Sequence, residues 1–159
     1  MWHEVWREIQ ADFTDVPGIA ELAQIIVRLL LAAVLGGLLG LQRELIGKAA
    51  GLRTHMLVAM GAAFFTLIPM QAGMPFTDLS RVLQGIIAGV GFLGAGTILQ
   101  LKKREQIVGL TTAAGLWLTA AIGIAAGMGR EVSAIVGTVL AFLILALLPH
   151  LTPQGDPEA

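Results

Sequence analysis

The chain has 159 residues, of which 56% are hydrophobic and only 13% are charged, and its mean hydropathy is +0.81. A soluble domain of this size could not bury so much apolar surface, so the composition indicates an integral membrane protein. The net charge of −1 offers no basic field for nucleic acid, and the absence of cysteine excludes disulfides, thiol chemistry and zinc–thiolate sites.

Residues 1–18 predict an amphipathic interfacial helix and a linker. The apolar residues there recur at helical spacing and lie opposite the polar ones. They are Trp2, Val5, Trp6, Ile9 and Phe13. Such a face is typical of a helix lying in the membrane interface. No basic start leads into an apolar core, so the segment does not resemble a cleavable signal peptide. It is either an orienting anchor or a helix that binds a partner.

Residues 19–150 are predicted to form an all-α transmembrane domain of five helices. Five apolar runs reach the spanning length of about 17 to 25 residues, and long runs favour helices over a barrel. The expected spans are Ile25–Leu41, His55–Gln71, Val82–Leu101, Ile107–Gly127 and Val132–Leu148. Residues 151–159 are expected to be a short cytoplasmic tail, with no soluble domain after it.

The loops carry an asymmetric distribution of positive charge. Six lysines and arginines lie in the loops after the first and third spans: Arg43, Lys48, Arg53, Lys102, Lys103 and Arg104. Only Arg7, Arg81 and Arg130 lie on the other side. Because cytoplasmic loops are enriched in lysine and arginine, the amino terminus is expected outside and the carboxyl terminus inside.

The sequence also contains a candidate internal repeat. GLRTHMLVAMGAA at 51–63 resembles GLTTAAGLWLTAA at 109–121, and the Gly37–Gly40 stretch resembles Gly91–Gly94. Spans 1–2 and 3–4 would then be a duplicated hairpin of parallel orientation. Inverted repeats are the commoner sign of alternating access, so this pattern counts slightly against a rocking transporter.

Glycine makes up 20 residues, and many glycines lie in the spans. In lipid, helices associate where small residues allow close backbone approach, so glycines four apart predict packing seams, as at Gly123 and Gly127. The other candidate packing residues are Gly36, Gly40, Gly85, Gly89, Gly91, Gly94 and Gly96. The glycine-rich third span is either held by neighbours on several sides or locally broken around GVGFLGAG to line a cavity. A dimer seam is a further use.

Arg28 lies within the first apolar run, where a charged side chain is unfavourable. It either snorkels to the outer surface, where Gln24 and Glu21 could receive it, or forms a buried link with Asp78 that ties spans 1 and 3.

The segment 39–57 combines charge, glycine and capping residues between two apolar runs. Arg43 and Arg53 are expected to pair with Glu44, and Thr54 is a candidate N-cap for the second span. Thr111 and Thr112 take the corresponding capping position at the fourth span. The segment is therefore either a solvated positive loop or a structured site at the cytoplasmic face.

The sequence contains no catalytic constellation and no evident metal site. His3, His55 and His150 are scattered, and we expect each to be a polar surface residue. No carboxylate lies deep within a span. Because Mg²⁺ prefers oxygen ligands and loses water reluctantly, the membrane interior offers it little, and we expect no cofactor.

Four blocks resemble the signature sequences of the MgtC/SapB membrane-protein family. They are LLLAAVLGGLLGLQRE, GLRTHMLVAMGA, DLSRVLQGIIAGVGFLGAGTIL and GLTTAAGLWLTAAIG, in this order between about Arg28 and Gly127. The resemblance implies a five-span bacterial inner-membrane protein associated with growth at low magnesium, virulence and survival inside host cells. Some members are described as magnesium transporters, and others as regulators that bind membrane partners such as ATP synthase.

By motif position, the resemblance places the family's characteristic polar residues on Arg28, Arg43, Glu44, Arg53, Thr54, His55, Asp78, Arg81, Thr111 and Thr112. The sequence departs from the pattern at Gln42, where an acid is common, and at Ala88, where serine or threonine is frequent.

Two functions follow as hypotheses. The first is a regulatory or interaction protein whose cytoplasmic face, residues 43–55 and 102–105, contacts a partner. The second is a transporter or channel for Mg²⁺ or another cation. We favour the first, as a homo-oligomer and most simply a dimer, and expect neither an enzyme nor a nucleic-acid binder.

Overall fold

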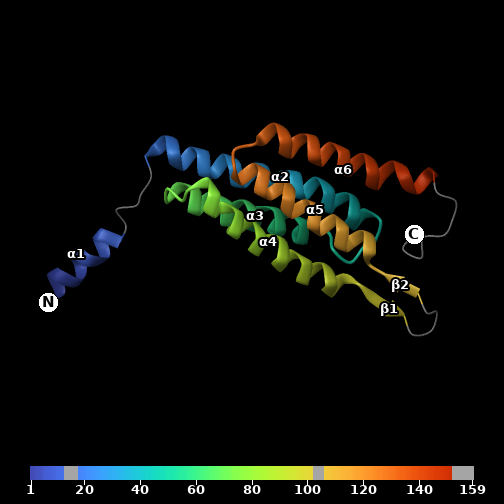
Figure 1. Cartoon of the computed structure of the whole chain (residues 1–159), viewed down its shortest axis with the longest axis horizontal. Coiled ribbons are helices and arrows are strands. Elements are labelled where there is room, and N and C mark those ends of the chain that lie inside the picture. The colour runs from blue at the N-terminus through green and yellow to red at the C-terminus, as the bar shows by residue number, and fades with distance from the viewer. Residues whose placement is uncertain (13–17, 102–105, 152–159) are drawn as a thin grey trace.

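Five long helices lie side by side and alternate in direction, in a computed structural model that describes residues 1–12, 18–101 and 106–151 (Figure 1). The helices are α1 (Trp2–Asp12), α2 (Ile19–Leu45), α3 (Leu52–Gln71), α4 (Phe76–Thr97), α5 (Leu110–Gly127) and α6 (Glu131–Leu151). Within the described residues, α2 to α6 are each long and apolar enough to cross a membrane. The predicted all-α, five-span fold is therefore confirmed.

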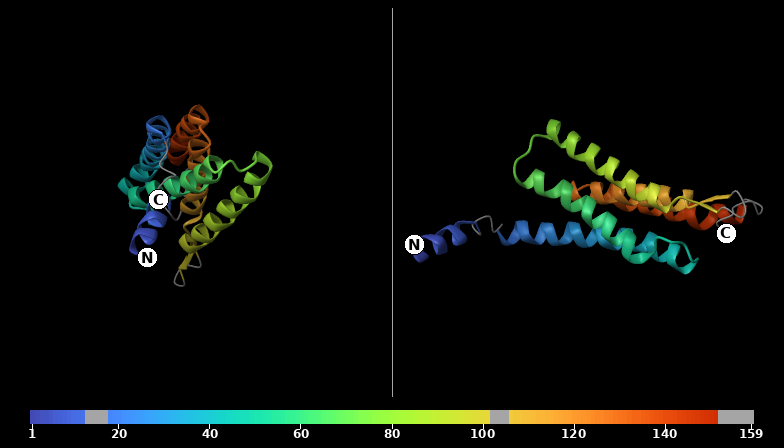
Figure 2. Two further views of the ribbon diagram at one scale, coloured as in Figure 1. Left: turned by 90° about the vertical axis from the view of Figure 1, so that its left-hand side faces the viewer. Right: turned by 90° about the horizontal axis from the view of Figure 1, so that it is seen from below.

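The first helix, α1, lies beyond one end of the bundle (Figures 1 and 2). Trp2 and Trp6 are exposed, so the apolar face predicted from the sequence is open to its surroundings. Phe13, the last residue of that predicted face, lies outside the described residues. The interfacial role of α1 stays a prediction.

The centre of the bundle consists of α2, α3 and α5, which pack closely because small residues line their contacts. A Cβ on Gly36 of α2 would lie 2.6 Å from the carbonyl oxygen of His55 and 2.7 Å from the Cβ of Ala59. A Cβ on Gly127 of α5 would lie 2.5 Å from the carbonyl oxygen of Ala63 in α3. Only glycine fits these positions without displacing a helix, as is usual where membrane helices approach closely.

Helices α4 and α6 flank this three-helix centre. α6 packs on α5 and α2, whereas α4 packs on α5 and α3. Only Leu79, Val90 and Gly94 of α4 are buried. A Cβ on Gly85, Gly89, Gly91 or Gly96 would meet nothing within 4 Å. From its sequence, the third span is expected to be either held by neighbours on several sides or broken around GVGFLGAG. In this single chain α4 is continuous, and these four glycines have no neighbouring helix against them.

The connection between α4 and α5 corrects the predicted ends of the third and fourth spans. Leu99–Leu101 (β1) and Gln106–Val108 (β2) form an antiparallel pair, with Leu99 opposite Val108. The sequence predicts residues 99–101 and 107–108 as parts of helices, because a short apolar run does not distinguish a strand from a buried helix. Gly109 follows with a φ of +96°, a left-handed conformation that glycine adopts readily, and α5 begins after it.

Each end of the bundle collects a distinct set of connections. At one end, called here the hairpin end, α2 finishes, α3 and α5 begin, and β1 and β2 lie (Figure 1). At the opposite end α2 begins, α3 leads into α4, and α5 leads into α6. Residues 152–159, and with them the predicted tail, lie outside the described residues. The proposed duplication of a helical hairpin stays a prediction.

Candidate functional site

Arg28 joins three helices at the opposite end of the bundle. Its Nη1 donates a hydrogen bond to the carbonyl oxygen of Gly127 at 3.3 Å, and its Nε lies 4.0 Å from Oε1 of Glu131. The first contact uses a carbonyl at the end of α5, where the helix dipole is negative and favours a cation. The alternative in which Arg28 links to Asp78 is therefore wrong, because the acid that lies 4.0 Å from Arg28 is Glu131 at the start of α6.

The turn between α5 and α6 is shaped around this arginine. Gly129 has a φ of +69°, and a Cβ there would lie 2.6 Å from Nη2 of Arg28. A larger residue would meet both a strained backbone and the guanidinium. The Arg28 link, defined as Arg28, Gly127 and Glu131, is therefore built from residues that the first span alone could not reveal.

The segment between α2 and α3 is structured by Glu44. Its Oε2 accepts a hydrogen bond of 2.7 Å from the backbone N–H of Leu52, the first residue of α3. A carboxylate here satisfies a free amide and suits the positive end of the helix dipole. Arg53 is exposed and forms no ion pair with Glu44, which corrects that part of the predicted pairing.

The predicted threonine caps are also wrong. The N-cap residue of α3 is Gly51 and that of α5 is Gly109, and neither helix start has a cap from its own side chain. Thr54 is exposed within the first turn of α3. The cap of α3 comes from another helix, which no local pattern of capping residues can reveal.

A group of polar side chains lies buried at the hairpin end. The Arg43 cluster, defined as the buried Arg43, His55 and Thr112 together with the half-buried Gln42, lies where α2, α3 and α5 meet. Arg43 and Thr112 are each 3% exposed and His55 is fully buried. Nη2 of Arg43 donates to Oγ1 of Thr112 at 3.4 Å, and Nε2 of Gln42 donates to the carbonyl oxygen of Leu145 in α6 at 3.2 Å.

His55 corrects the expectation of a polar surface histidine. Its Nδ1 lies 3.0 Å from the carbonyl oxygen of Gly51, within the first turn of α3. The buried threonines Thr66, Thr119 and Thr138 each donate to a carbonyl four residues earlier in their own helix. Among the described buried side chains, Nε2 of His55 and Oε1 of Gln42 have no hydrogen-bond partner. Buried polar groups are rarely left so.

The remaining candidate residues do not join either group. Asp78 and Arg81 are exposed in the first turns of α4, and Thr111 is half-buried beside Thr112. The structure thus brings together Arg43, His55 and Thr112 and leaves the others at the rims. The sequence marks Gln42 only as a departure from the family pattern, and no local signal predicts its contact with Leu145 of α6.

The buried polar side chains among the described residues belong to arginine, histidine and threonine. In the part of the chain that the structure describes, no group of three or more histidine, aspartate or glutamate residues lies together. The Arg43 cluster combines a cation with neutral side chains. Its chemistry suits hydrogen bonding between helices, whereas Mg²⁺ requires several oxygen ligands.

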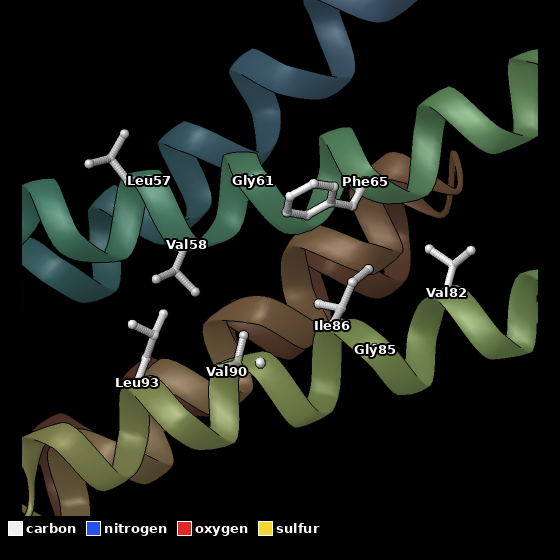
Figure 3. A pocket seen from close by; sticks show the side chains of 10 residues that line it. Leu57, Val58, Gly61, Phe65, Val82, Gly85, Ile86, Val90 and Leu93 are labelled. Carbon is white, nitrogen blue, oxygen red and sulfur yellow. The ribbon is translucent and has the colours of Figure 1, made fainter.

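An apolar groove of about 530 Å³ opens between α3 and α4 (Figure 3). Its lining combines large side chains such as Phe65 and Leu93 with the bare backbone of Gly61, Gly85 and Gly89. The two exposed glycines of α4, Gly85 and Gly89, therefore line this groove.

Five apolar helices of spanning length define a multi-pass membrane protein. The chain belongs to the MgtC family, whose sequence profile matches residues 29–153.

Relatives from several bacteria match most of the chain. It is 42% identical over 137 residues to YhiD of Escherichia coli (strain K12), a candidate magnesium transporter by its name, and covers 63% of that protein. It is 45% identical over 130 residues to protein SrpB of Synechococcus elongatus, covering 71%. It is 42% identical over 128 residues to protein MgtC of Brucella abortus (strain 2308), covering 52%. These matches include 82%, 75% and 80% of the present chain, respectively. No solved structure matches it.

Proposed function

We propose that the chain is a membrane-embedded regulatory or interaction protein of the MgtC type, which acts in adaptation to low magnesium and in virulence or intracellular survival. The proposal assigns it no catalytic activity. Its resemblance to the family supports the link to low magnesium and virulence, and the buried polar groups of the bundle support the regulatory or interaction role.

The observation that carries this proposal is the character of the Arg43 cluster. Arg43 carries a buried positive charge, and its Nη2 donates a hydrogen bond to the hydroxyl oxygen of Thr112. The bundle's described carboxylates, on Glu21, Glu44, Asp78 and Glu131, belong to the ends of helices. A divalent cation crossing the bundle would meet positive charge at the hairpin end and no anionic oxygen midway, which disfavours passage.

The proposed contact surface for a partner is the exposed part of the segment between α2 and α3. Arg43 and His55 are buried, so this part of the surface is narrower than the sequence predicted and includes Arg53 and Thr54. Residues 102–105, the other part of the predicted surface, lie outside the described residues. The excess of lysine and arginine supports placing this hairpin end in the cytoplasm, with the amino terminus outside. A membrane protein such as ATP synthase is the partner that resemblance to the family implies.

We also propose that the chain forms a homo-oligomer, with a dimer as the simplest case, through the exposed glycine side of α4. Gly85 and Gly89 are four residues apart and border the groove. Such small-residue faces favour close helix association in lipid. A Gly89→Leu variant should lower the fraction of dimer in single-molecule photobleaching in bilayers, whereas Ile135→Leu on exposed α6 should leave it unchanged.

The alternative function is transport of Mg²⁺ or another cation, and the name of YhiD is the observation that favours it. A magnesium-sensitive dye inside proteoliposomes distinguishes the two functions. We expect the dye signal to rise no faster than in empty vesicles. A faster rise that Asp78→Asn or Glu44→Gln abolishes would establish transport and contradict the proposal.

Co-purification from bacterial membranes tests the interaction directly. A bound membrane protein should be retained by the wild-type chain and lost from Arg53→Ala, while Arg81→Ala, an exposed arginine at the opposite end, should retain it. If both variants retain the partner equally, the proposed contact surface is contradicted.

A further inference from the structure

The fully buried ring of His55 has one nitrogen whose role the fold does not explain. Nδ1 lies 3.0 Å from the carbonyl oxygen of Gly51. Because a carbonyl oxygen only accepts hydrogen bonds, Nδ1 carries the proton of this contact. In the uncharged ring Nε2 is then an acceptor, and no donor among the described residues lies within hydrogen-bond distance of it.

Gly115 of α5 leaves space in front of this nitrogen. Outside its own stretch of helix, a Cβ on Gly115 would have one heavy atom within 4 Å, which is Nε2 of His55 at 3.7 Å. At this point α5 therefore presents bare backbone toward the histidine ring, and the contact is looser than the seam at Gly127.

Thr112 supplies a second polar group on the same side of α5. It lies one turn before Gly115, and residues three apart share a helix face. Its hydroxyl oxygen accepts from Arg43 at 3.4 Å, so its own O–H is left to donate. The region between α3 and α5 thus contains one acceptor and one donor that do not bond each other directly.

We propose that a single water molecule is bound between α3 and α5, where it donates a hydrogen bond to Nε2 of His55 and accepts one from the hydroxyl of Thr112. Water supplies both functions, and buried waters typically join otherwise unsatisfied groups in this way. A metal cation fits poorly, because the cationic Arg43 belongs to the same cluster and the carboxylate of Glu44 is bonded to the start of α3.

The water would be a polar bridge between two helices that also pack through small apolar residues. Ala59 and Ala63 of α3 pack against Gly123 and Gly127 of α5. These contacts have no direction, whereas a bridged hydrogen bond fixes the register of one helix against the other. The proposal does not depend on whether the protein regulates a partner or transports an ion.

Solid-state NMR of the full chain in lipid bilayers tests the proposal. A His3→Gln/His150→Gln background restricts the ¹⁵N-histidine signals to His55. We expect an uncharged ring with the proton on Nδ1 and magnetisation transfer from water protons to Nε2. A proton on Nε2, or the absence of any water transfer to it, would overturn the proposal.

Two variants at Gly115 provide a matched comparison. In Gly115→Ala the methyl group takes the space of the water without a donor, so the water signal should disappear and the melting temperature should fall. In Gly115→Ser the hydroxyl can donate directly to Nε2, so the water signal should disappear while the melting temperature stays above that of the alanine variant. Helix propensity alone gives the opposite order, with alanine more stable than serine.

A water signal that persists in both variants, or a serine variant no more stable than the alanine variant, would contradict the assigned site. If neither variant folds, the measurement on the histidine background with Gly115 intact decides the question.

Discussion

Replacing Gly36 by alanine should destabilise the bundle through a clash that no side-chain rotation can relieve. The added Cβ would lie 2.6 Å from the carbonyl oxygen of His55 and 2.7 Å from the Cβ of Ala59. Ordinary contacts of this kind begin near 3.4 Å, so α2 and α3 must separate by about 0.8 Å. Both neighbouring atoms belong to backbone or to a side chain without rotamers, and the helices themselves must therefore move.

The magnitude follows from two opposing contributions. Overpacking of a close contact typically destabilises by about 1–3 kcal/mol. Alanine in place of glycine within a helix returns about 1 kcal/mol. We therefore expect Gly36→Ala to lower the free energy of unfolding by about 0–2 kcal/mol. Gly91→Ala, where the new Cβ meets nothing within 4 Å, should raise it by up to about 1 kcal/mol.

The assay is equilibrium unfolding of purified protein in mixed micelles, with helix content followed by circular dichroism as the fraction of denaturing detergent rises. The separation between the two variants is the decisive quantity, because both make the same chemical change in a helix of the same protein. If Gly36→Ala proves as stable as Gly91→Ala, the packing of α2 on α3 is not as close as described and the reasoning fails.

Three further predictions concern the ends of the helices. Glu44→Ala should lower the free energy of unfolding by about 1–2 kcal/mol, because the amide at the start of α3 loses its acceptor. Glu44→Gln should show a smaller decrease in the same assay, because its amide oxygen can still accept the hydrogen bond. Glu131→Gln should change the free energy of unfolding by less than about 1 kcal/mol, because its pair with Arg28 at 4.0 Å is partly exposed, and the change should be smaller at high salt. The control Asp78→Asn, which is not paired with Arg28, should change neither the stability nor its salt dependence. Gly109→Ala should lower stability by about 1 kcal/mol or more, since its φ of +96° is unfavourable for any residue with a Cβ, and a stable variant in thermal denaturation would contradict that conformation.

The parts of the fold that follow from composition were predictable, because apolar runs long enough to cross a bilayer have few alternatives. The exact helix ends were not. Ile107 and Val108 continue an apolar pattern that suits a helix as well as a strand, and only their pairing with Leu99 and Gln100 decides between the two.

The candidate site was predicted less well, because its contacts join residues far apart in the chain. The sequence located Arg43, Glu44 and His55 as a group, but the burial of His55 depends on how α5 packs against α3. The partner of Arg28 is Glu131, at the start of another helix, while the nearer choices by span geometry were Glu21 and Asp78. The glycine pattern predicted close packing without distinguishing Gly36, which is enclosed, from Gly91, which is open.

The limited burial of α4 has a thermodynamic consequence. Its inner side is anchored by few enclosed residues, Leu79, Val90 and Gly94, while α2, α3 and α5 hold one another through interlocked backbones. A helix attached so lightly can open as a separate cooperative unit, at a free energy well below that of global unfolding. Amide protons of α4 should then exchange with solvent deuterium sooner than those of the three central helices.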